Sequence, residues 1–387
     1  CEISIQSDEK SDCASEALWF LEATYTEKRK IYMLPGFVTE KKSSWEFLAE
    51  TELPVFIYGM GDGAVKILNV FEKYNIPVAG FFASDEFVRG HSFQGHLVHT
   101  LSQIEKLIDD FVVVLAFGAG YPSLYKRIKD IASRHTLLAP DVPVYGGGLF
   151  TPEYCEENCD KLNAVYNMLA DEKSKQTFAN VINYKISGKT EYLDRCTSPE
   201  EEIFSDILHL SDNETYIDMG AYNGDTVIKF SEAVNGKYDK IYALEPDTRN
   251  FRKLTKNTDG MEHLHLFNAA AWSEDTLLTF ADRSGRQSTL NPQTEQKMKE
   301  VAALRGDSLT ENATYIKMDV EGSEHEAILG CAQSLKNGSK LAAALYHRNE
   351  DMFDIPLLVH EINPQLKMYI RHQLYIPAWE TNLYCTL

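Results

Sequence analysis

Two separate stretches of the sequence alternate between short apolar runs and longer amphipathic runs, and this pattern constrains the fold more than any other feature. The first stretch begins near Leu53 and the second near Glu214. Short buried strands that alternate with helices indicate a parallel sheet with helices on both faces. The sequence therefore predicts an α/β protein with two Rossmann-like parallel-sheet domains.

The places where the alternation starts and stops predict the domain boundaries. The expected parts are an N-terminal helical segment over 1–50, a Rossmann-like accessory domain over 51–150, a helical linker over 151–202 and a second sheet domain over 203–387. The chain ends with two apolar runs separated by Pro377. These runs are typical of an antiparallel hairpin at the edge of a sheet.

The charge of the chain excludes several classes of partner. There are 38 Lys and Arg residues against 58 Asp and Glu residues, so the formal net charge is −20. A field of this sign repels nucleic-acid backbones and anionic lipids, and no run reaches the roughly 18 apolar residues of a membrane span. The seven cysteines show no disulfide or metal-ligand spacing. We therefore expect a cytoplasmic protein that binds neither nucleic acid nor membranes.

The first chemically informative segment is YIDMGAYNGDT, over residues 216–226. A hydrophobic strand ends at Asp218, and Gly220 and Gly224 then let the backbone pass close to a ligand before a helix begins. The spacing is G-x-x-x-G rather than the G-x-G-x-x-G of nicotinamide enzymes, and the Asp218 carboxylate suits an amino group. A plain strand–helix turn is the structural alternative.

A second acidic strand end follows at Glu245, 25 residues after Gly220. A carboxylate at the tip of the second strand can accept hydrogen bonds from both hydroxyls of a ribose. NAD-dependent enzymes use the same arrangement. Glu245 therefore indicates an adenosyl ribose without identifying the cofactor.

A third acidic strand end carries Asp319, which Glu321 and Glu324 follow closely. Open α/β sheets bind ligands at this edge, and His347 closes the next strand there as a candidate general base. A packing role suits His347 equally well, and Glu321 and Glu324 also suit the start of a helix. Asp319, Glu321 and His347 are residue types that bind a divalent metal, but no tight ligand spacing supports such a site. We therefore expect no metal.

Taken in order, these segments resemble the FkbM family of S-adenosylmethionine-dependent methyltransferases. The resemblance covers residues 203–385 and is carried by YIDMGAYNGDT, ALEPDTRNFRKLTKN, NAAAWSEDTLLTF and YIKMDVEGSEHEAILG. A parallel sheet closed by one late antiparallel strand is also the arrangement of class I methyltransferases. The resemblance implies S-adenosylmethionine as cofactor and O-methylation of a hydroxyl group on a small-molecule or sugar-type acceptor.

The resemblance also implies roles for individual residues. Methyl transfer to an alcohol requires the protein to position the hydroxyl and accept its proton, and the candidates are Asp319, His347 and Glu321. The implied cofactor contacts, from the methionine end through the ribose to the adenine, are Asp218, Gly220, Gly224, Glu245, Pro246, Asp247, Ala270 and Trp272. For Trp272, an ordinary core aromatic is the alternative.

The first sheet domain leaves more alternatives open. Gly59, Gly61 and Gly63 follow a strand, but the third glycine comes one residue early for a dinucleotide turn. Asp85 lies where a ribose-binding acid would follow, and Gly118 and Gly120 form a second glycine-rich turn.

Three interpretations of this domain follow. It resembles the N-terminal domain of sugar acyltransferases that bind nucleotide sugars, which would make the acceptor nucleotide-linked or the chain a non-catalytic nucleotide-sugar binding protein. A working turn at Gly59–Gly63 would instead predict a nicotinamide-dependent oxidoreductase. A degenerate module would serve substrate selection or dimerisation, and a homodimer is then the expected assembly.

Overall fold

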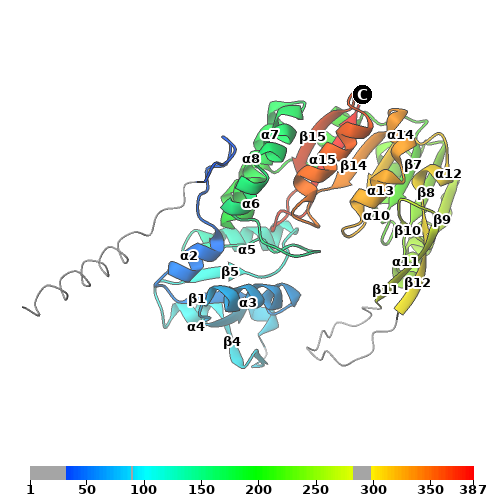
Figure 1. Ribbon diagram of the computed structural model, residues 1–387. Helices are drawn as coiled ribbons and strands as arrows, with labels where there is room; N and C mark the ends of the chain where they lie inside the picture. The colour runs from blue at the N-terminus through cyan, green and yellow to red at the C-terminus, as the bar shows by residue number, and fades with distance from the viewer. Residues whose placement is uncertain (1–31, 89, 282–297) are drawn as a thin grey trace, which may run out of the picture. The chain divides into compact units, whose positions relative to one another are not determined.

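The computed structural model describes residues 32–88, 90–281 and 298–387. Leu34–Leu387 pack as one unit, in which two sheets are joined by a group of helices (Figure 1). Residues 1–31 of the expected N-terminal helical segment lie outside the described part of the chain.

The first sheet has six strands in the order β3-β4-β2-β1-β5-β6. Every neighbouring pair is parallel except β3–β4, and the inner strands β2, β1 and β5 are completely buried. This is the Rossmann-like arrangement that the sequence predicts. The strands are β1 (Val55–Tyr58), β2 (Gly80–Ala83), β3 (Ser92–Phe93), β4 (His96–Thr100), β5 (Val112–Leu115) and β6 (Thr136–Leu138), and the helices between them are α3 (Asp62–Tyr74), α4 (Leu101–Glu105) and α5 (Pro122–Ala132).

A short helix before the first strand belongs to the same domain. α2 (Ser44–Glu50) begins with a capping box, in which Ser43 and Glu46 satisfy each other's backbone N–H groups. Trp45 of α2 is buried and packs edge-on against Phe71 of α3, with ring centroids 6.4 Å apart. The packing of the first domain therefore begins before residue 51.

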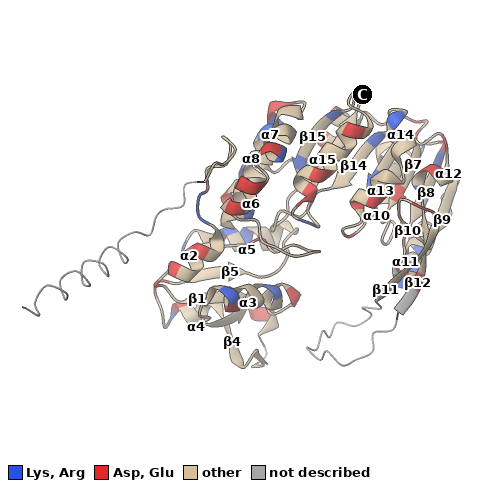
Figure 2. Cartoon of the chain, in the orientation of Figure 1, with Lys and Arg blue, Asp and Glu red and all other residues tan. Residues whose placement is uncertain are grey.

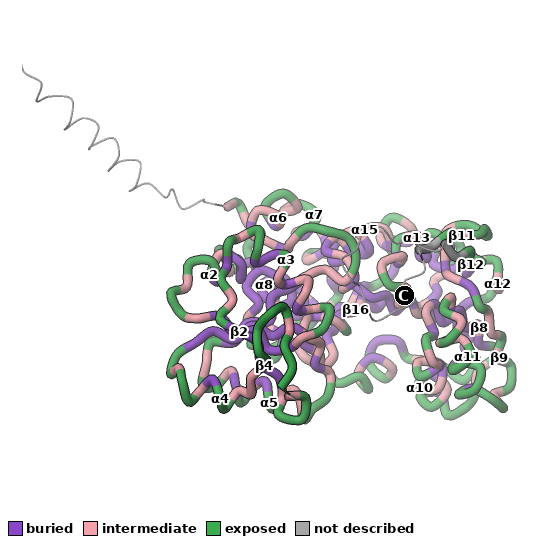
Figure 3. The backbone as a smooth tube through the Cα atoms, turned by 90° about the horizontal axis from the view of Figure 1, so that it is seen from below, coloured by how far each residue is buried: buried purple, intermediate pink, exposed green. Residues whose placement is uncertain are grey.

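Four helices follow the first sheet, and the last two of them contact the second sheet. They are α6 (Pro152–Glu157), α7 (Cys159–Met168), α8 (Glu172–Ser187) and α9 (Glu191–Cys196). The Tyr184 hydroxyl of α8 donates to the carbonyl of Ala139, just after β6, at 2.7 Å. At the other end of α8, Asp171 accepts hydrogen bonds from Arg371 of the second sheet. One continuous hydrophobic core runs through these helices, as the buried segments of Figure 3 show.

The second sheet has seven strands in the order β15-β16-β14-β13-β7-β8-β9. Among the described strands of this sheet, only β16 runs antiparallel to its neighbours, and β15 and β16 form the expected hairpin at the sheet edge. This is the class I methyltransferase arrangement. The strands are β7 (Thr215–Met219), β8 (Lys240–Leu244), β9 (Leu264–Phe267), β13 (Tyr315–Met318), β14 (Lys340–Ala344), β15 (Lys367–His372) and β16 (Thr381–Thr386).

A small three-stranded sheet and several helices complete the second half. The small sheet has the order β10-β12-β11 and follows directly after β9. Its strands are β10 (Ala270–Ala271), β11 (Thr276–Ala281) and β12 (Met298–Leu304), and the helices are η2 (Ile203–Leu208), α10 (Asp225–Ala233), α11 (Thr248–Asn257), α12 (Gly306–Leu309), α13 (Glu324–Leu329), α14 (Ala332–Lys336) and α15 (Asp351–Ile362).

Acidic side chains recur on the helices of both halves, including α6, α7 and α15, and basic side chains are scattered among them (Figure 2). None of the helices within the described ranges is long and apolar enough to cross a membrane.

Arg371 stabilises the attachment of α8 to the second sheet. Its side chain is 3% exposed, and it forms ion pairs with Asp171 at 2.7 Å and Glu202 at 2.9 Å. Replacement by methionine leaves Asp171 without this cation and Glu202 with Lys173 alone, so we expect Arg371→Met to lower the free energy of unfolding by about 3 kcal/mol. Urea unfolding measures this, and Arg252→Met, which removes an exposed arginine, should cost less than about 0.5 kcal/mol.

The same ion pairs predict a dependence of stability on pH. Burial raises the pKa of Asp171 and Glu202, but hydrogen bonds from Arg371 and their other polar partners outweigh burial and lower both pKa values. Groups with lowered pKa values in the folded state add stability above their unfolded pKa, and this contribution is lost as the pH falls below about 4. Arg371→Met should therefore lose less stability than the wild type between about pH 5 and pH 3. Equal acid sensitivity of the two proteins would contradict this account.

Candidate active site

The carboxyl ends of β7, β8 and β13 open into a cavity of about 2310 Å³. Gly220, Glu245 and Asp319 line it from the second half of the chain, while Gly118 and Tyr145 line it from the first half. Open α/β sheets bind their ligands at this edge. We therefore take this cavity as the candidate active site.

Two glycines after β7 set how closely the neighbouring segments approach. Gly220 has φ +84°, and a Cβ atom there would lie 1.8 Å from the carbonyl oxygen of Asp319. Gly224 has φ +90° and caps α10 against Leu254, whose Cδ1 atom would be 3.0 Å from an added Cβ. The ends of β7 and β13 are therefore in direct backbone contact beside the cavity.

Asp218 is completely buried and pairs with other protein groups. Its Oδ2 atom accepts a hydrogen bond from the Thr226 hydroxyl at 2.5 Å, and Lys317 Nζ lies 3.4 Å from Oδ1. Lys317 also donates to the carbonyl of Gly220 at 3.2 Å. Burial lowers the pKa of Lys317, but the charges of Asp218 and Asp319 outweigh it and raise this pKa. Asp218 therefore holds the ammonium group of Lys317, and Lys317 fixes the Gly220 turn through its hydrogen bond to the Gly220 carbonyl.

Glu245 has the position that the sequence predicts for a ribose-binding acid. Its carboxylate is largely buried and lines the cavity. The backbone N–H of Tyr222 donates to Oε2 at 2.9 Å, and that of Asp247 donates to Oε1 at 2.8 Å. Burial raises the pKa of Glu245. Each carboxylate oxygen accepts more than one hydrogen bond, so both can also accept from a pair of ligand hydroxyls.

Four more of the residues expected around the cofactor line the cavity: Pro246, Asp247, Ala270 and Trp272. Asp218 and Gly224 are not among its lining residues. The Asp247 carboxylate accepts hydrogen bonds from the backbone N–H groups of Arg249 and Asn250, which makes it the N-cap of α11. Ala270 belongs to β10, and the backbone N–H of Trp272 donates to Leu304 of β12. The small sheet therefore holds this wall of the cavity in place.

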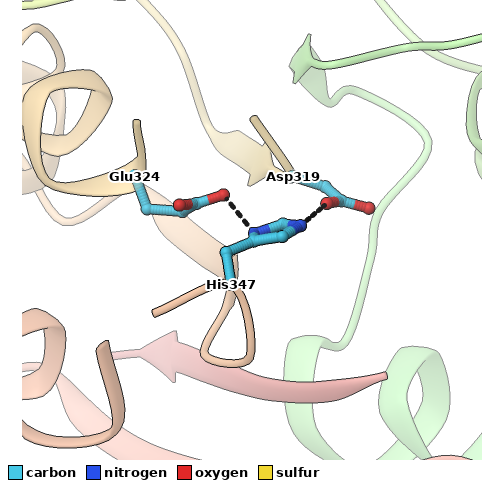
Figure 4. Close-up of side chains that lie close together, drawn as sticks. All are labelled: Asp319, Glu324 and His347. Atoms are coloured by element: carbon cyan, nitrogen blue, oxygen red, sulfur yellow. Dashed lines mark hydrogen bonds and ion pairs between the residues drawn. The ribbon is translucent and has the colours of Figure 1, made fainter. Parts of the chain in front are cut away.

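Next to the cavity, the carboxylates of Glu324 and Asp319 lie on either side of the His347 imidazole ring (Figure 4), and Glu321 lies near the same ring. His347 Nδ1 lies 2.8 Å from Glu324 Oε1, and Nε2 lies 3.4 Å from Asp319 Oδ1 and 3.5 Å from Glu321 Oε2. Burial lowers the pKa of His347, but the hydrogen bond and charge of Glu324, with Asp319 and Glu321, outweigh it and raise the pKa to about 9. The surroundings of this ring therefore favour positive charge on the imidazole.

Asp319 and His347 differ in their access to the cavity. Asp319 lines the cavity and its side chain is 35% exposed, whereas the His347 side chain is 2% exposed. The Tyr346 hydroxyl donates to Asp319 Oδ1 at 3.1 Å, and Lys317 Nζ lies 3.9 Å from Oδ2. Asp319 can therefore contact a ligand in the cavity, whereas His347 contacts Asp319 and can hold its carboxylate in position.

Glu324 begins α13, as expected of a helix-start acid, but sequence reasoning missed its contact with His347. It is fully buried, bonds His347, and also accepts a hydrogen bond from the backbone N–H of Val320 at 2.9 Å. One feature of the sequence indicates that Glu324 is buried. Ala327 and Ile328 follow it at the i+3 and i+4 spacing that places all three residues on one buried helix face.

Tyr145 and Arg348 were also missed. The backbone N–H of Tyr145 donates to the His347 carbonyl at 2.8 Å, and the Arg348 guanidinium lies 4.8 Å from the centre of the Tyr145 ring. Arg348 also donates to the carbonyl of Gly322 at 2.9 Å. A residue of the first half of the chain thus covers the turn after β13, and no local sequence pattern indicates such a distant contact.

The space beside each glycine turn of the first domain is filled by other residues of the protein. A Cβ atom on Gly59 would lie 2.7 Å from the Phe117 ring, and one on Gly63 would lie 2.3 Å from the Ala116 carbonyl oxygen. Gly118 and Gly120 both pack against Tyr375 of the loop between β15 and β16. These glycines make room for neighbouring parts of the chain, and Asp85 lies in a separate 3₁₀ turn, η1 (Asp85–Phe87).

Residues 218–345 match the family model described as the methyltransferase FkbM domain. This part of the chain is an FkbM methyltransferase domain. The match begins at Asp218 and extends past Asp319 to the end of β14, so it contains the three acidic strand ends described above. It supports a methyltransferase and not the nicotinamide-dependent oxidoreductase that the Gly59–Gly63 turn suggested.

Solved structures are similar to this chain in fold. Methyltransferase FkbM from Methylobacillus flagellatus KT is 20% identical with a TM-score of 0.65, over 97% of this chain and 99% of that chain. The likeness in fold therefore includes the first sheet. An rRNA methylase from Streptococcus thermophilus is 14% identical with a TM-score of 0.31, over 51% of this chain and 96% of that chain. None of the curated proteins matches the chain.

Proposed function

We propose that the FkbM domain transfers a methyl group from S-adenosylmethionine to a hydroxyl oxygen of an acceptor bound in the cavity. One observation carries this proposal: Glu245 and Asp319, at the ends of two strands of one sheet, line the same cavity on either side of the Gly220 turn. The first is suited to bind a ribose and the second to accept a proton.

The cofactor would lie along the ends of β7 and β8. The Glu245 carboxylate accepts hydrogen bonds from the ribose hydroxyls, because two backbone N–H groups already fix its orientation. Ala270 and Trp272 flank the adenine, and the close backbone contact at Gly220 brings the methionine end of the cofactor next to Asp319. The negative charges at the end of β13 favour the positively charged sulfonium there.

The transfer is an in-line displacement at the methyl carbon. The acceptor oxygen forms a bond to this carbon while the carbon–sulfur bond breaks, and the electron pair of that bond stays on sulfur in the demethylated cofactor. The hydroxyl proton goes to the Asp319 carboxylate, which acts as general base. Tyr346 and His347 hold this carboxylate in position, so we assign positioning roles to both. Glu321 follows Asp319 in the same turn, and we place it beside the bound acceptor.

We further propose that the acceptor is an uncharged, hydroxyl-rich small molecule or sugar. The lining of the cavity includes eleven Asp and Glu residues against five Lys and Arg residues, which disfavours polyanionic ligands such as nucleic acids or nucleotide-linked sugars. Tyr121, Tyr145 and Tyr375 add aromatic faces with polar tips to the wall formed by both halves. Such a wall suits ring-shaped ligands that have both apolar faces and hydroxyl groups.

Calorimetric titration of the purified chain with S-adenosylmethionine tests the cofactor assignment. We expect micromolar binding by the wild type and a loss of about 10- to 150-fold in Glu245→Gln, because hydrogen bonds to a charged group contribute about 1.5–3 kcal/mol. Glu311→Gln removes an exposed acid elsewhere in the same half and should bind as the wild type does. Full affinity in Glu245→Gln, or binding of NAD⁺ in place of S-adenosylmethionine, would overturn the assignment.

A further inference from the structure

We infer that His347, Asp319 and Glu321 bind a divalent transition-metal ion at the acceptor end of the cavity, with Glu324 orienting the histidine from behind. From the sequence alone we expected no metal, because Asp319 and Glu321 follow β13 whereas His347 follows β14, and the three share no tight ligand spacing. The fold brings them together around one ring nitrogen.

The distances among the donor atoms fit a tetrahedral ion. His347 Nε2 lies 3.4 Å from Asp319 Oδ1 and 3.5 Å from Glu321 Oε2. Both distances exceed those of ordinary N–H···O hydrogen bonds, which span about 2.7–3.2 Å. Bonds of about 2.0–2.2 Å to a tetrahedral Zn²⁺ ion place its ligand atoms about 3.4 Å apart, which is the distance of His347 Nε2 from each of these two carboxylate oxygens.

Glu324 supplies the outer contact that histidine ligands commonly have. Its Oε1 atom lies 2.8 Å from His347 Nδ1, so a proton on Nδ1 leaves the Nε2 lone pair directed to Asp319 and Glu321. Glu324 is fully buried, and its Oε2 atom has no hydrogen-bond partner among the described residues. A buried carboxylate with an unsatisfied oxygen needs positive charge nearby.

The charge of the cluster points in the same direction. Three carboxylates surround one imidazole, so a protonated ring leaves a net charge of −3 + 1 = −2. A neutral ring with a divalent ion leaves −3 + 2 = −1. Lys317, which lies 3.9 Å from Asp319, is already paired with Asp218 at 3.4 Å. A divalent ion therefore balances the cluster better than a proton does.

The donor set also selects the class of metal. One imidazole nitrogen and two carboxylate oxygens in a tetrahedral arrangement suit Zn²⁺ or Co²⁺, whereas Mg²⁺ and Ca²⁺ prefer six or more oxygen ligands. Glu321 is 81% exposed and Asp319 is 35% exposed, so the fourth position of the ion would face the cavity. There the ion would lower the pKa of an acceptor hydroxyl, which makes proton transfer to Asp319 easier.

Metal binding can be measured without cofactor or acceptor. The whole chain is stripped with a chelator and titrated with Zn²⁺ by calorimetry, and with Co²⁺ by visible absorption, because tetrahedral cobalt absorbs far more strongly than octahedral cobalt. We expect one site, a tetrahedral cobalt spectrum, and much weaker binding of Mg²⁺. Glu321→Gln, a change of an exposed side chain, and His347→Gln should each weaken Zn²⁺ binding at least tenfold. Glu324→Gln should weaken it about 10- to 100-fold.

His325→Gln is the matched control, because His325 is an exposed histidine just after the same turn and is not part of the cluster. It should bind Zn²⁺ as the wild type does. Absence of Zn²⁺ and Co²⁺ binding, or equal binding by the wild type and Glu321→Gln, would overturn the inference. Loss of binding in His325→Gln alone would also overturn it. S-adenosylmethionine binding is measured separately, so failure of the metal site and failure of the proposed methyltransferase reaction remain distinguishable.

Discussion

Gly220→Ala should lower the free energy of unfolding by more than about 4 kcal/mol, or prevent folding of the chain. A Cβ atom at this position would lie 1.8 Å from the carbonyl oxygen of Asp319 and 2.9 Å from its carbonyl carbon. These are backbone atoms of the adjacent strand end, so no side-chain rotation removes the overlap. The φ angle of +84° adds about 1–2 kcal/mol for a residue with a side chain.

Gly260→Ala separates the two contributions to this effect. Gly260 has the same φ of +84°, and nothing lies within 4 Å of an added Cβ atom. It should therefore cost only the conformational strain of about 1–2 kcal/mol. Urea unfolding followed by circular dichroism gives both values. Equal stability of the two variants would show that the ends of β7 and β13 are not in the contact described above.

Asp319→Asn should reduce the rate of methyl transfer by about 10²- to 10⁴-fold, which is the usual contribution of a general base. The amide keeps the size of the side chain and can still accept from the Tyr346 hydroxyl, but it cannot accept the acceptor's proton. Transfer of radiolabelled methyl groups from S-adenosylmethionine to hydroxyl compounds in a protein-free extract measures the rate.

The affinity for S-adenosylmethionine distinguishes a lost base from a damaged site. We expect Asp319→Asn to bind the cofactor within about threefold of the wild type, because the ribose contact at Glu245 is unaffected. Asp259→Asn, a change of an exposed acid before β9, should retain both the affinity and the rate. Unchanged methyl transfer in Asp319→Asn would exclude Asp319 as the base.

The sequence predicted the two sheets and the acidic strand ends because both depend on local patterns. Apolar runs followed by glycine or an acid mark where a parallel strand ends, and such ends meet at one edge of a sheet. Asp218, Glu245 and Asp319 were placed correctly at strand ends for this reason. The pattern did not show that Asp218 is completely buried, because the salt bridge to Lys317 depends on the pairing of β7 with β13.

The sequence could not predict contacts between segments far apart in the chain. Tyr145 reaches His347 across about 200 residues, and nothing local to either residue indicates the other. The glycines at 118 and 120 show a further limit, because a glycine-rich turn has the same sequence whether a phosphate or an aromatic ring fills the space. In the structure a ring fills it, that of Tyr375.

The contact between this glycine turn and Tyr375 limits how the two halves of the chain can be exchanged by recombination during evolution. Ala119 and Ile376 exchange two backbone hydrogen bonds, at 2.7 and 3.1 Å, and side chains on Gly118 or Gly120 would collide with the Tyr375 ring. A recombination event that joined this N-terminal half to a different methyltransferase core would have to transfer the loop between β15 and β16 as well. The codons for residues 118–120 and 374–376 are therefore expected to diverge as one unit, although those for residues 121–373 lie between them.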